Sequence, residues 1–138
     1  MTLSEVQRLI DLAPFHDWLQ PVLEAVDEQG GVELRLPFRP EFRRSRDRDD
    51  IHGGVIAALA DIACHAAAAG HAGRGLPTID IRVDYLRGAD GTDLLAHARV
   101  LKAGRTIAVS QVDIKDQRGR LIAVGRGCFL TLAVPPAA

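Results

Sequence analysis

The stretch from Gly53 to Ala69 constrains the fold more than any other part of the chain. It reads GGVIAALADIACHAAAA, and its apolar residues recur at helical spacing on nearly every side of the helix that they predict. A helix that is apolar nearly all round is a buried helix. Other elements must therefore enclose it, and we expect one domain over residues 1–138, with the central helix at residues 52–70.

Asp61 interrupts this apolar stretch. No lysine or arginine lies between Arg48 and Arg74, so no ion pair within a helical turn or two can compensate the charge. A carboxylate in apolar surroundings is costly unless it is paired or protonated, and Asp61 lies too far into the helix to be its N-cap. Two interpretations remain open: an arginine arrives from elsewhere in the fold, or the acid serves chemistry in a cleft.

His52, Gly53 and Gly54 stand at the start of the same helix. Glycines let another group approach the backbone N–H donors, which have no partner in the first turn and lie at the positive end of the helix dipole. Such donors form an oxyanion hole when a carbonyl oxygen meets them. Gly53 precedes Asp61 by eight residues, or about 12 Å of helix, so one straight helix cannot offer both groups to one carbonyl. A site shared between two chains would resolve this.

Residues 1–20 predict an N-terminal helical segment. Ser4 and Gln7 have the spacing of a capping box, and Pro14 predicts the end of the first helix. A second short turn can follow near Trp18. This segment either packs on the domain or covers a ligand pocket.

The remainder of the chain predicts mainly strands. Residues 30–40 alternate apolar and charged positions, as a half-exposed strand does, whereas residues 41–50 mix charges of both signs and predict a loop. Four more strand-like segments, with short connections, predict an antiparallel meander beside the helix and hence an α+β fold. These segments lie at residues 78–86, 93–104, 105–116 and 119–134.

The composition narrows the class of protein. The chain has 17 basic and 18 acidic residues, a net charge of −1 and 4% aromatic residues, which argues against a nucleic-acid partner. Cys64 and Cys128 form no metal or disulfide pattern, which suits a reducing cytosol, and look like small core residues. We find no signal peptide, and no apolar run approaches the roughly 20 residues that span a bilayer. We therefore expect a cytoplasmic protein without a membrane partner.

Three segments carry a resemblance to a known family. They are HGGVIAALAD, TIDIRVDYLRGA and RVLKAGRTIAVSQVDI, and together they make residues 30–132 similar to the PaaI-like acyl-CoA thioesterases of the hotdog-fold superfamily. The resemblance implies a five-stranded antiparallel sheet wrapped around a long central helix. It also implies an acyl-CoA substrate, no cofactor beyond it, and a homodimer, often a homotetramer, with its sites at the dimer interface.

The resemblance also implies roles for individual residues. Asp61 matches the catalytic acid, which acts as general base for water or as nucleophile, and Gly53 matches the glycine whose N–H polarises the thioester carbonyl. His52 matches a supporting histidine, and Thr78 matches a hydroxyl from the partner chain that holds water near the acid.

One position departs from the family pattern. Arg46 stands where many members carry asparagine or glutamine, and it can pair with Asp61, hold an acidic acyl group or face solvent. Basic residues near turns contact the phosphates of coenzyme A in this family, although ordinary exposed charges explain them as well. The substrate-binding candidates are Arg46, Gly54, Arg87, Lys102, Gly104 and Arg105.

Three other functions are alternatives to the thioesterase. Asp61, His52 and His65 suggest a metal site, but no further ligand stands at compact spacing, so no metal is predicted. A hotdog hydratase or dehydratase pairs a histidine and an acid in a different motif. A non-catalytic acyl-CoA-binding protein keeps the fold but gains nothing from a desolvated acid at position 61.

Overall fold

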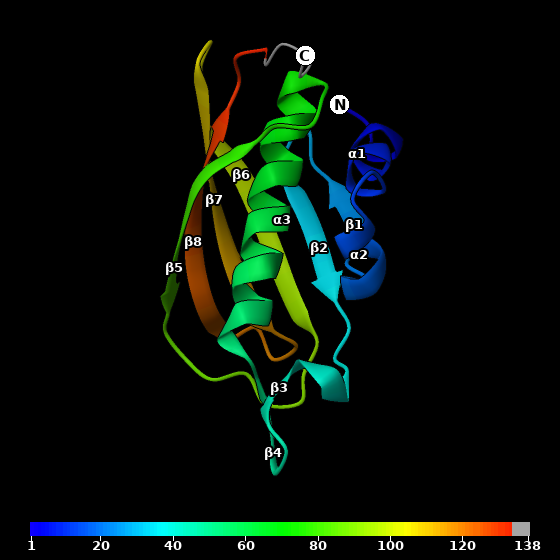
Figure 1. Cartoon of the computed structure of the whole chain (residues 1–138), viewed down its shortest axis with the longest axis vertical. Helices are drawn as coiled ribbons and strands as arrows, with labels where there is room; N and C mark the ends of the chain where they lie inside the picture. The colour runs from blue at the N-terminus through cyan, green and yellow to red at the C-terminus, as the bar shows by residue number, and fades with distance from the viewer. Residues whose placement is uncertain (134–138) are drawn as a thin grey trace, which may run out of the picture.

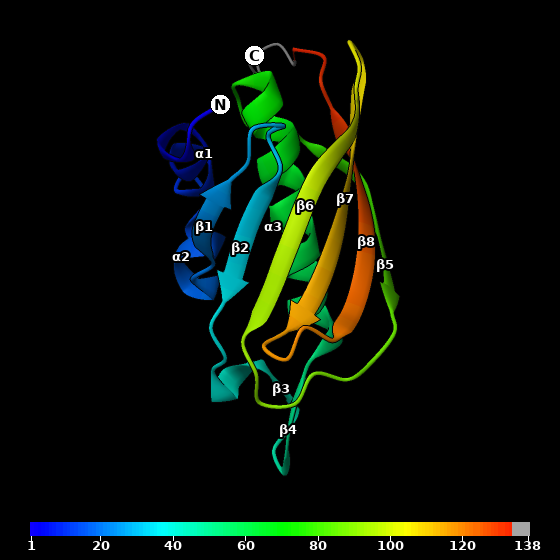
Figure 2. The ribbon, with the colours of Figure 1, turned by 180° about the vertical axis from the view of Figure 1, so that it is seen from behind.

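The computed structural model describes residues 1–133 of the chain. A six-stranded antiparallel sheet curves around one long helix, α3 (Gly53–Ala72), as Figure 1 shows. Seen from behind, the strands cover α3 (Figure 2). The strands lie in the order β1 (Val22–Val26), β2 (Val32–Leu36), β6 (Leu94–Ala103), β7 (Ile107–Asp116), β8 (Leu121–Leu130) and β5 (Thr78–Tyr85). The α+β hotdog arrangement expected from the sequence is confirmed.

α3 is the buried helix that its apolar pattern predicts, two residues longer than expected at its C-terminal end. Half of its residues are buried, and two glycines of β8 let it approach the sheet closely. A Cβ added at Gly125 would lie 3.4 Å from the Cβ of Ala60, and one added at Gly127 would lie 3.0 Å from that of Cys64. Small residues on both surfaces therefore set the distance between helix and sheet.

The expectation that no apolar run reaches membrane-spanning length is wrong for α3. Its 20 residues are long and apolar enough, by length and composition, to cross a bilayer. The reason lies in its role as the core helix, because a helix enclosed by a sheet needs the same all-round apolar surface that lipid would demand. The sheet and the N-terminal helices cover much of that surface.

The N-terminal segment forms α1 (Leu3–Ile10) and α2 (Pro14–Leu19), which lie beside α3 at the β1 edge of the sheet (Figure 1). The cap of α1 is Thr2 and not the expected Ser4. The Thr2 hydroxyl accepts the N–H of Glu5 at 3.3 Å, and the Glu5 carboxylate accepts the N–H of Thr2 at 2.7 Å. The charged acceptor favours this box, because a carboxylate is stabilised at a helix N-terminus.

The sheet has one strand more than expected, and its order differs from a plain meander. β1 pairs with β2 at one edge, through a turn in which Asp27 accepts the N–H groups of Gln29 and Gly31. β6, β7 and β8 form the expected meander, but β5 pairs with β8 at the far edge rather than with β6. That placement makes β5 an edge strand.

Residues 41–50 do not form the expected loop, because they contain most of a hairpin. Its elements are η1 (Pro40–Phe42), β3 (Arg43–Ser45) and β4 (Arg48–Ile51). Asp50 is 7% exposed and accepts from both Arg44 and Arg48. Burial raises the pKa of Asp50, but the two guanidinium groups outweigh it and hold the pKa below its usual value. Charge pairing thus stabilises a hairpin that lacks apolar periodicity.

Candidate active site

The first turn of α3 leaves one backbone donor free. His52 is the N-cap, and its Nδ1 accepts the N–H of Gly54 at 2.8 Å. Val55 and Ile56 donate to the His52 carbonyl at 3.0 and 3.4 Å. The N–H of Gly53 has no acceptor within residues 1–133. Gly53 can therefore meet a ligand oxygen, whereas the Gly54 donor is occupied within the chain.

Tyr85 covers this turn, and it is a site residue that the sequence does not predict. Its hydroxyl donates to the Gly53 carbonyl at 2.7 Å, and its ring lies 3.4 Å from the point where a Cβ on Gly53 would stand. The alternation of β5 contained the signal, because Ile81, Val83 and Tyr85 share one face of the strand. Tyr85 thereby links the end of β5 to the start of α3.

Asp61 lies near the middle of α3, beside the start of β5. Thr78 donates its hydroxyl to Asp61 Oδ1 at 3.1 Å. Asp61 is partly exposed and forms no ion pair within the described part of the chain, so no arginine of the same chain compensates it. The expectation that Thr78 comes from the partner chain is wrong, because the edge strand β5 brings Thr78 to Asp61 of its own chain.

His65 follows Asp61 by one helical turn. Its Nε2 accepts the N–H of Leu76 at 3.1 Å, and its ring meets that of Phe129 edge-on, with centroids 5.7 Å apart. Burial lowers the pKa of His65 below its usual value, against the opposite effect of Asp61. The ring is therefore neutral at physiological pH. Among residues 1–133, no three His, Cys, Asp or Glu side chains are grouped to hold a metal ion.

A cavity of about 680 Å³ opens beside Gly53. Apolar side chains and Tyr85 form part of its wall, and four arginines and two aspartates line the remainder, which leaves an excess of two positive charges. The arginines are Arg44, Arg48, Arg87 and Arg120. Guanidinium groups of this kind suit phosphate or carboxylate ligands.

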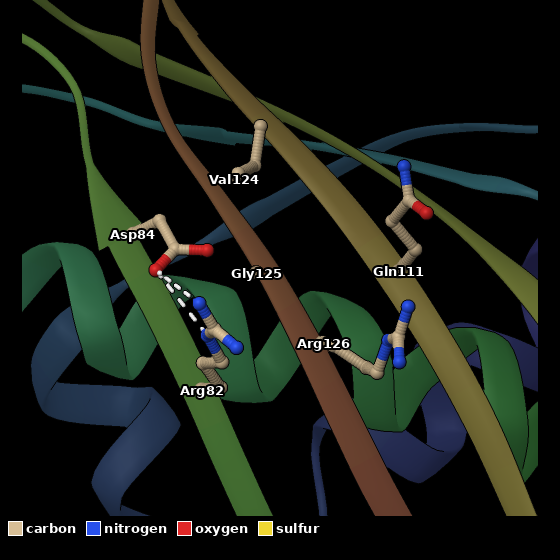
Figure 3. A pocket seen from close by; sticks show the side chains of 6 residues that line it. All are labelled: Arg82, Asp84, Gln111, Val124, Gly125 and Arg126. Atoms are coloured by element: carbon tan, nitrogen blue, oxygen red, sulfur yellow. Dashed lines mark hydrogen bonds and ion pairs between the residues drawn. The ribbon is translucent and has the colours of Figure 1, made fainter.

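A second hollow, of about 330 Å³, lies on the other face of the sheet (Figure 3). Arg82, Asp84, Gln111 and Arg126 surround it, and Arg82 donates to Asp84 at 3.2 and 3.3 Å. α3 lies behind the strands in this view, so the sheet separates the hollow from α3. It does not belong to the same site.

Comparison with known proteins places the chain in a family. The model of the thioesterase superfamily matches residues 49–123, more than half of the chain. The chain belongs to the thioesterase superfamily. The medium/long-chain acyl-CoA thioesterase YigI of Escherichia coli is 30% identical to it over an alignment of 132 residues that covers 85% of this chain and 84% of YigI.

Solved structures agree with this assignment. The X-ray structure of another protein of the superfamily is 34% identical, with a TM-score of 0.87 over 93% of this thioesterase and 96% of that chain. The E. coli PaaI protein shares the fold, with a TM-score of 0.76 at 22% identity over 93% and 94% of the two chains. The predicted PaaI-like family, hotdog fold and thioester-hydrolase class are confirmed.

The thioesterase does not bring all of its predicted site residues together within one chain. Lys102, Gly104 and Arg105 lie at the β6–β7 turn. There the Gly104 carbonyl accepts the Thr131 hydroxyl at 2.8 Å, and the Thr131 carbonyl accepts from Arg74 at 2.6 Å. Because Arg74 follows the C-terminal end of α3, this group lies at the opposite end of the helix from Gly53 (Figure 1).

Arg46 and Arg87 differ in their placement. Arg87 follows β5 and lines the cavity beside Gly53. Arg46 is exposed at the turn between β3 and β4, at the tip of a hairpin that projects from the molecule (Figure 1). Of the three roles considered for Arg46, the single chain shows only the one in which it faces solvent.

Proposed function

We propose that this thioesterase hydrolyses an acyl-CoA thioester to a free acid and coenzyme A, with Asp61 as the catalytic acid and Gly53 as the oxyanion donor. The observation that carries the proposal is the state of Asp61. It lies on the buried helix of the fold, Thr78 holds one of its oxygens, and no cation neutralises it within the described residues. Once a second copy covers this position, a purely structural carboxylate would need an ionic partner, whereas a catalytic one needs a free oxygen.

The second component is the N–H of Gly53. It has no acceptor in residues 1–133, lies at the positive end of a 20-residue helix and lines the arginine-rich cavity. A thioester carbonyl bound there would develop negative charge in front of a fixed donor, which lowers the barrier to attack. His52 supports this arrangement because it engages Gly54 and fixes the first turn.

The two components lie about 12 Å apart along α3, so we propose that two copies share each site. β5 is the last strand of the sheet, and Ile79 and Tyr85 within it and Leu86 directly after it are exposed. If β5 pairs antiparallel with β5 of a second copy, the Thr78 end of one strand meets the Tyr85 end of the other. Asp61 of one copy then lies beside Gly53 of the other. Pairing of two such dimers would give the homotetramer.

The substrate class follows from charge. Coenzyme A carries phosphates, and the cavity beside Gly53 has an arginine excess with Arg87 free of any carboxylate partner among the described ion pairs. The relative YigI is named for medium and long acyl-CoA substrates. We therefore propose acyl-CoA, with its phosphates near these arginines. Lys102 and Arg105 would reach a substrate only from a second copy.

Water, the acid and the oxyanion donor suffice for thioester hydrolysis, so the proposal includes no metal or redox cofactor. We place the reaction in the cytoplasm. Asp61 either activates water or attacks the carbonyl itself. Attack by Asp61 would form a mixed anhydride and release coenzyme A as its thiolate, and water would then open the anhydride. A single turnover in ¹⁸O-labelled water tests this route, because label in the Asp61 carboxylate arises only when water opens such an anhydride at the Asp61 carbonyl, whereas general-base catalysis puts the label in the product acid alone.

The test is hydrolysis of an acyl-CoA panel that includes short, long, aromatic and dicarboxylic members, by the wild type and by Asp61→Asn. We expect the variant to melt at or above the wild-type temperature and to keep its affinity for coenzyme A but to lose roughly 10²–10⁴-fold in kcat. Asp17→Asn is the control, because Asp17 is an exposed acid of α2. Wild-type rates in Asp61→Asn would refute the proposal, and binding without hydrolysis by the wild type would identify an acyl-CoA-binding protein instead.

A further inference from the structure

The segment from Gly73 to Pro77 connects α3 to β5 and delivers Thr78 to Asp61. Beyond the helix-cap bonds from Gly73 and Arg74 to the Ala69 carbonyl, three interactions hold it. Arg74 donates to the Thr131 carbonyl at 2.6 Å, the Pro77 carbonyl accepts the N–H of Leu130 at 2.9 Å, and the Leu76 N–H donates to His65 Nε2 at 3.1 Å. Of these three, only the bond to the Leu76 N–H involves a side chain of α3. Leu76 lies two residues before Thr78.

His65 and Asp61 together form a two-point attachment. They stand one turn apart on the same face of α3, so one bonds Leu76 and the other bonds Thr78. The ring of His65 also packs on Phe129, and Phe129 lies opposite Thr78 in the β5–β8 register. The imidazole therefore touches both the segment before Thr78 and the strand beside it.

The hydrogen bond fixes the protonation state that this attachment requires. A backbone N–H can donate only to an unprotonated nitrogen, so Nε2 is bare and Nδ1 carries the proton of the neutral ring. The charged or titratable groups that act on the ring are Asp61 of α3, which favours the imidazolium, and His16 of α2, which opposes it.

We infer that His65 is a positioning residue of the hydrolytic site, which holds the Thr78 hydroxyl against Asp61 through its bond to the Leu76 N–H. The inference rests on the proposed function, because it assumes that the Thr78–Asp61 pair acts on the thioester. A purely structural histidine would contribute to stability alone. A positioning histidine raises kcat, and this effect disappears when Thr78 loses its hydroxyl.

The test is a double-mutant cycle between His65→Leu and Thr78→Val. Leucine is similar in size and still packs on Phe129 but cannot accept the Leu76 N–H. We expect His65→Leu to lower kcat about two- to tenfold, as the loss of one hydrogen bond would, with KM nearly unchanged. In the Thr78→Val background the same change should have no further effect on kcat. His65→Gln, which keeps an acceptor without a titrating ring, should restore most of kcat.

A second measurement does not depend on activity. Hydrogen exchange at the Leu76 amide should speed up in His65→Leu and stay slow in His65→Gln. Three results would each overturn the inference. The first is a double variant whose loss in kcat equals the product of the two single losses. The others are an unchanged kcat in His65→Leu and an unchanged exchange rate of the Leu76 amide in that variant. Failure of the proposed function is distinguishable, because then Asp61→Asn leaves hydrolysis intact while the exchange measurement still reports on the Leu76 bond.

Discussion

Two inactive variants should restore each other if each site draws on two copies of the chain. Gly53→Pro removes the oxyanion donor, because proline has no N–H. Position 53 is the first residue of α3, where proline is favoured, and the preceding His52 has φ −61° and ψ 134°, as residues before proline prefer. Asp61→Asn removes the acid. Neither change should prevent folding.

The size of the effect follows from symmetry. Gly53→Pro alone should lose roughly 10²–10³-fold in kcat, the usual effect of deleting one oxyanion donor. A dimer with one copy of each variant has one site with both defects and one site with neither, because Asp61 and Gly53 of a site come from different copies. Random mixing makes half of the dimers mixed, so activity should recover to about a quarter of the wild-type value.

The assay is acyl-CoA hydrolysis after the two variants are unfolded together and refolded at equal concentration. Activity near the mean of the two separate variants would refute the shared site, and with it the antiparallel pairing of β5. Gly53→Ala is the matched control, since it keeps the N–H and its methyl group would meet the Tyr85 ring at 3.4 Å, an ordinary contact. Gly53→Ala should remain active by itself, without a second variant to complement it.

Three further predictions concern stability. Burial raises the pKa of Asp116, but hydrogen bonds from Arg120 outweigh it and hold the pKa below its usual value. Asp116 should therefore contribute to the free energy of unfolding above about pH 4 and lose this contribution in stronger acid, so Asp116→Asn should weaken the loss of stability at low pH in urea unfolding. Gly127→Ala puts a methyl group 2.6 Å from a buried phenylalanine ring and should cost about 1–3 kcal/mol in urea unfolding, whereas Gly75→Ala, with open space around it, should be near neutral. Burial lowers the pKa of His65 below its unfolded value of about 6.5, so the unfolded chain binds the proton first as the pH falls. The free energy of unfolding should therefore decrease below about pH 6.5, and His65→Gln should reduce this decrease in urea unfolding across the same pH range.

The features that the sequence predicted correctly are those that depend on local pattern. The all-round apolar character of residues 53–69 predicts the core helix, and the absence of basic residues between Arg48 and Arg74 excludes an ion pair between Asp61 and its own helix. The glycines at the helix start predict a free donor, since the first turn of any helix leaves its N–H groups without partners. Each inference needs only neighbours along the chain.

The features that the sequence does not predict depend on contacts between distant segments. The β3–β4 hairpin is held by arginines around Asp50, and periodicity cannot report cross-strand charge pairs. Which of two glycine donors stays free depends on the rotamer of His52. Thr78 contacts Asp61 of its own chain because β5 pairs with β8 at the edge of the sheet. The pattern of a strand does not tell which edge of the sheet the strand occupies.

Asp61 also predicts a conflict between assembly and activity. It is partly exposed in the single chain, and pairing through β5 would cover it, so the dimer carries the cost of desolvating a charge that the monomer leaves near water. Asp61→Asn removes the charge but keeps the shape, and should stabilise the dimer by roughly 0.5–2 kcal/mol while it lowers kcat. Melting at two or more protein concentrations measures this, because the melting temperature of a dimer rises with concentration. If the variant dimer were weaker than the wild type, the carboxylate would be contributing to the interface, and its place on an otherwise apolar helix would need a structural explanation instead of a catalytic one.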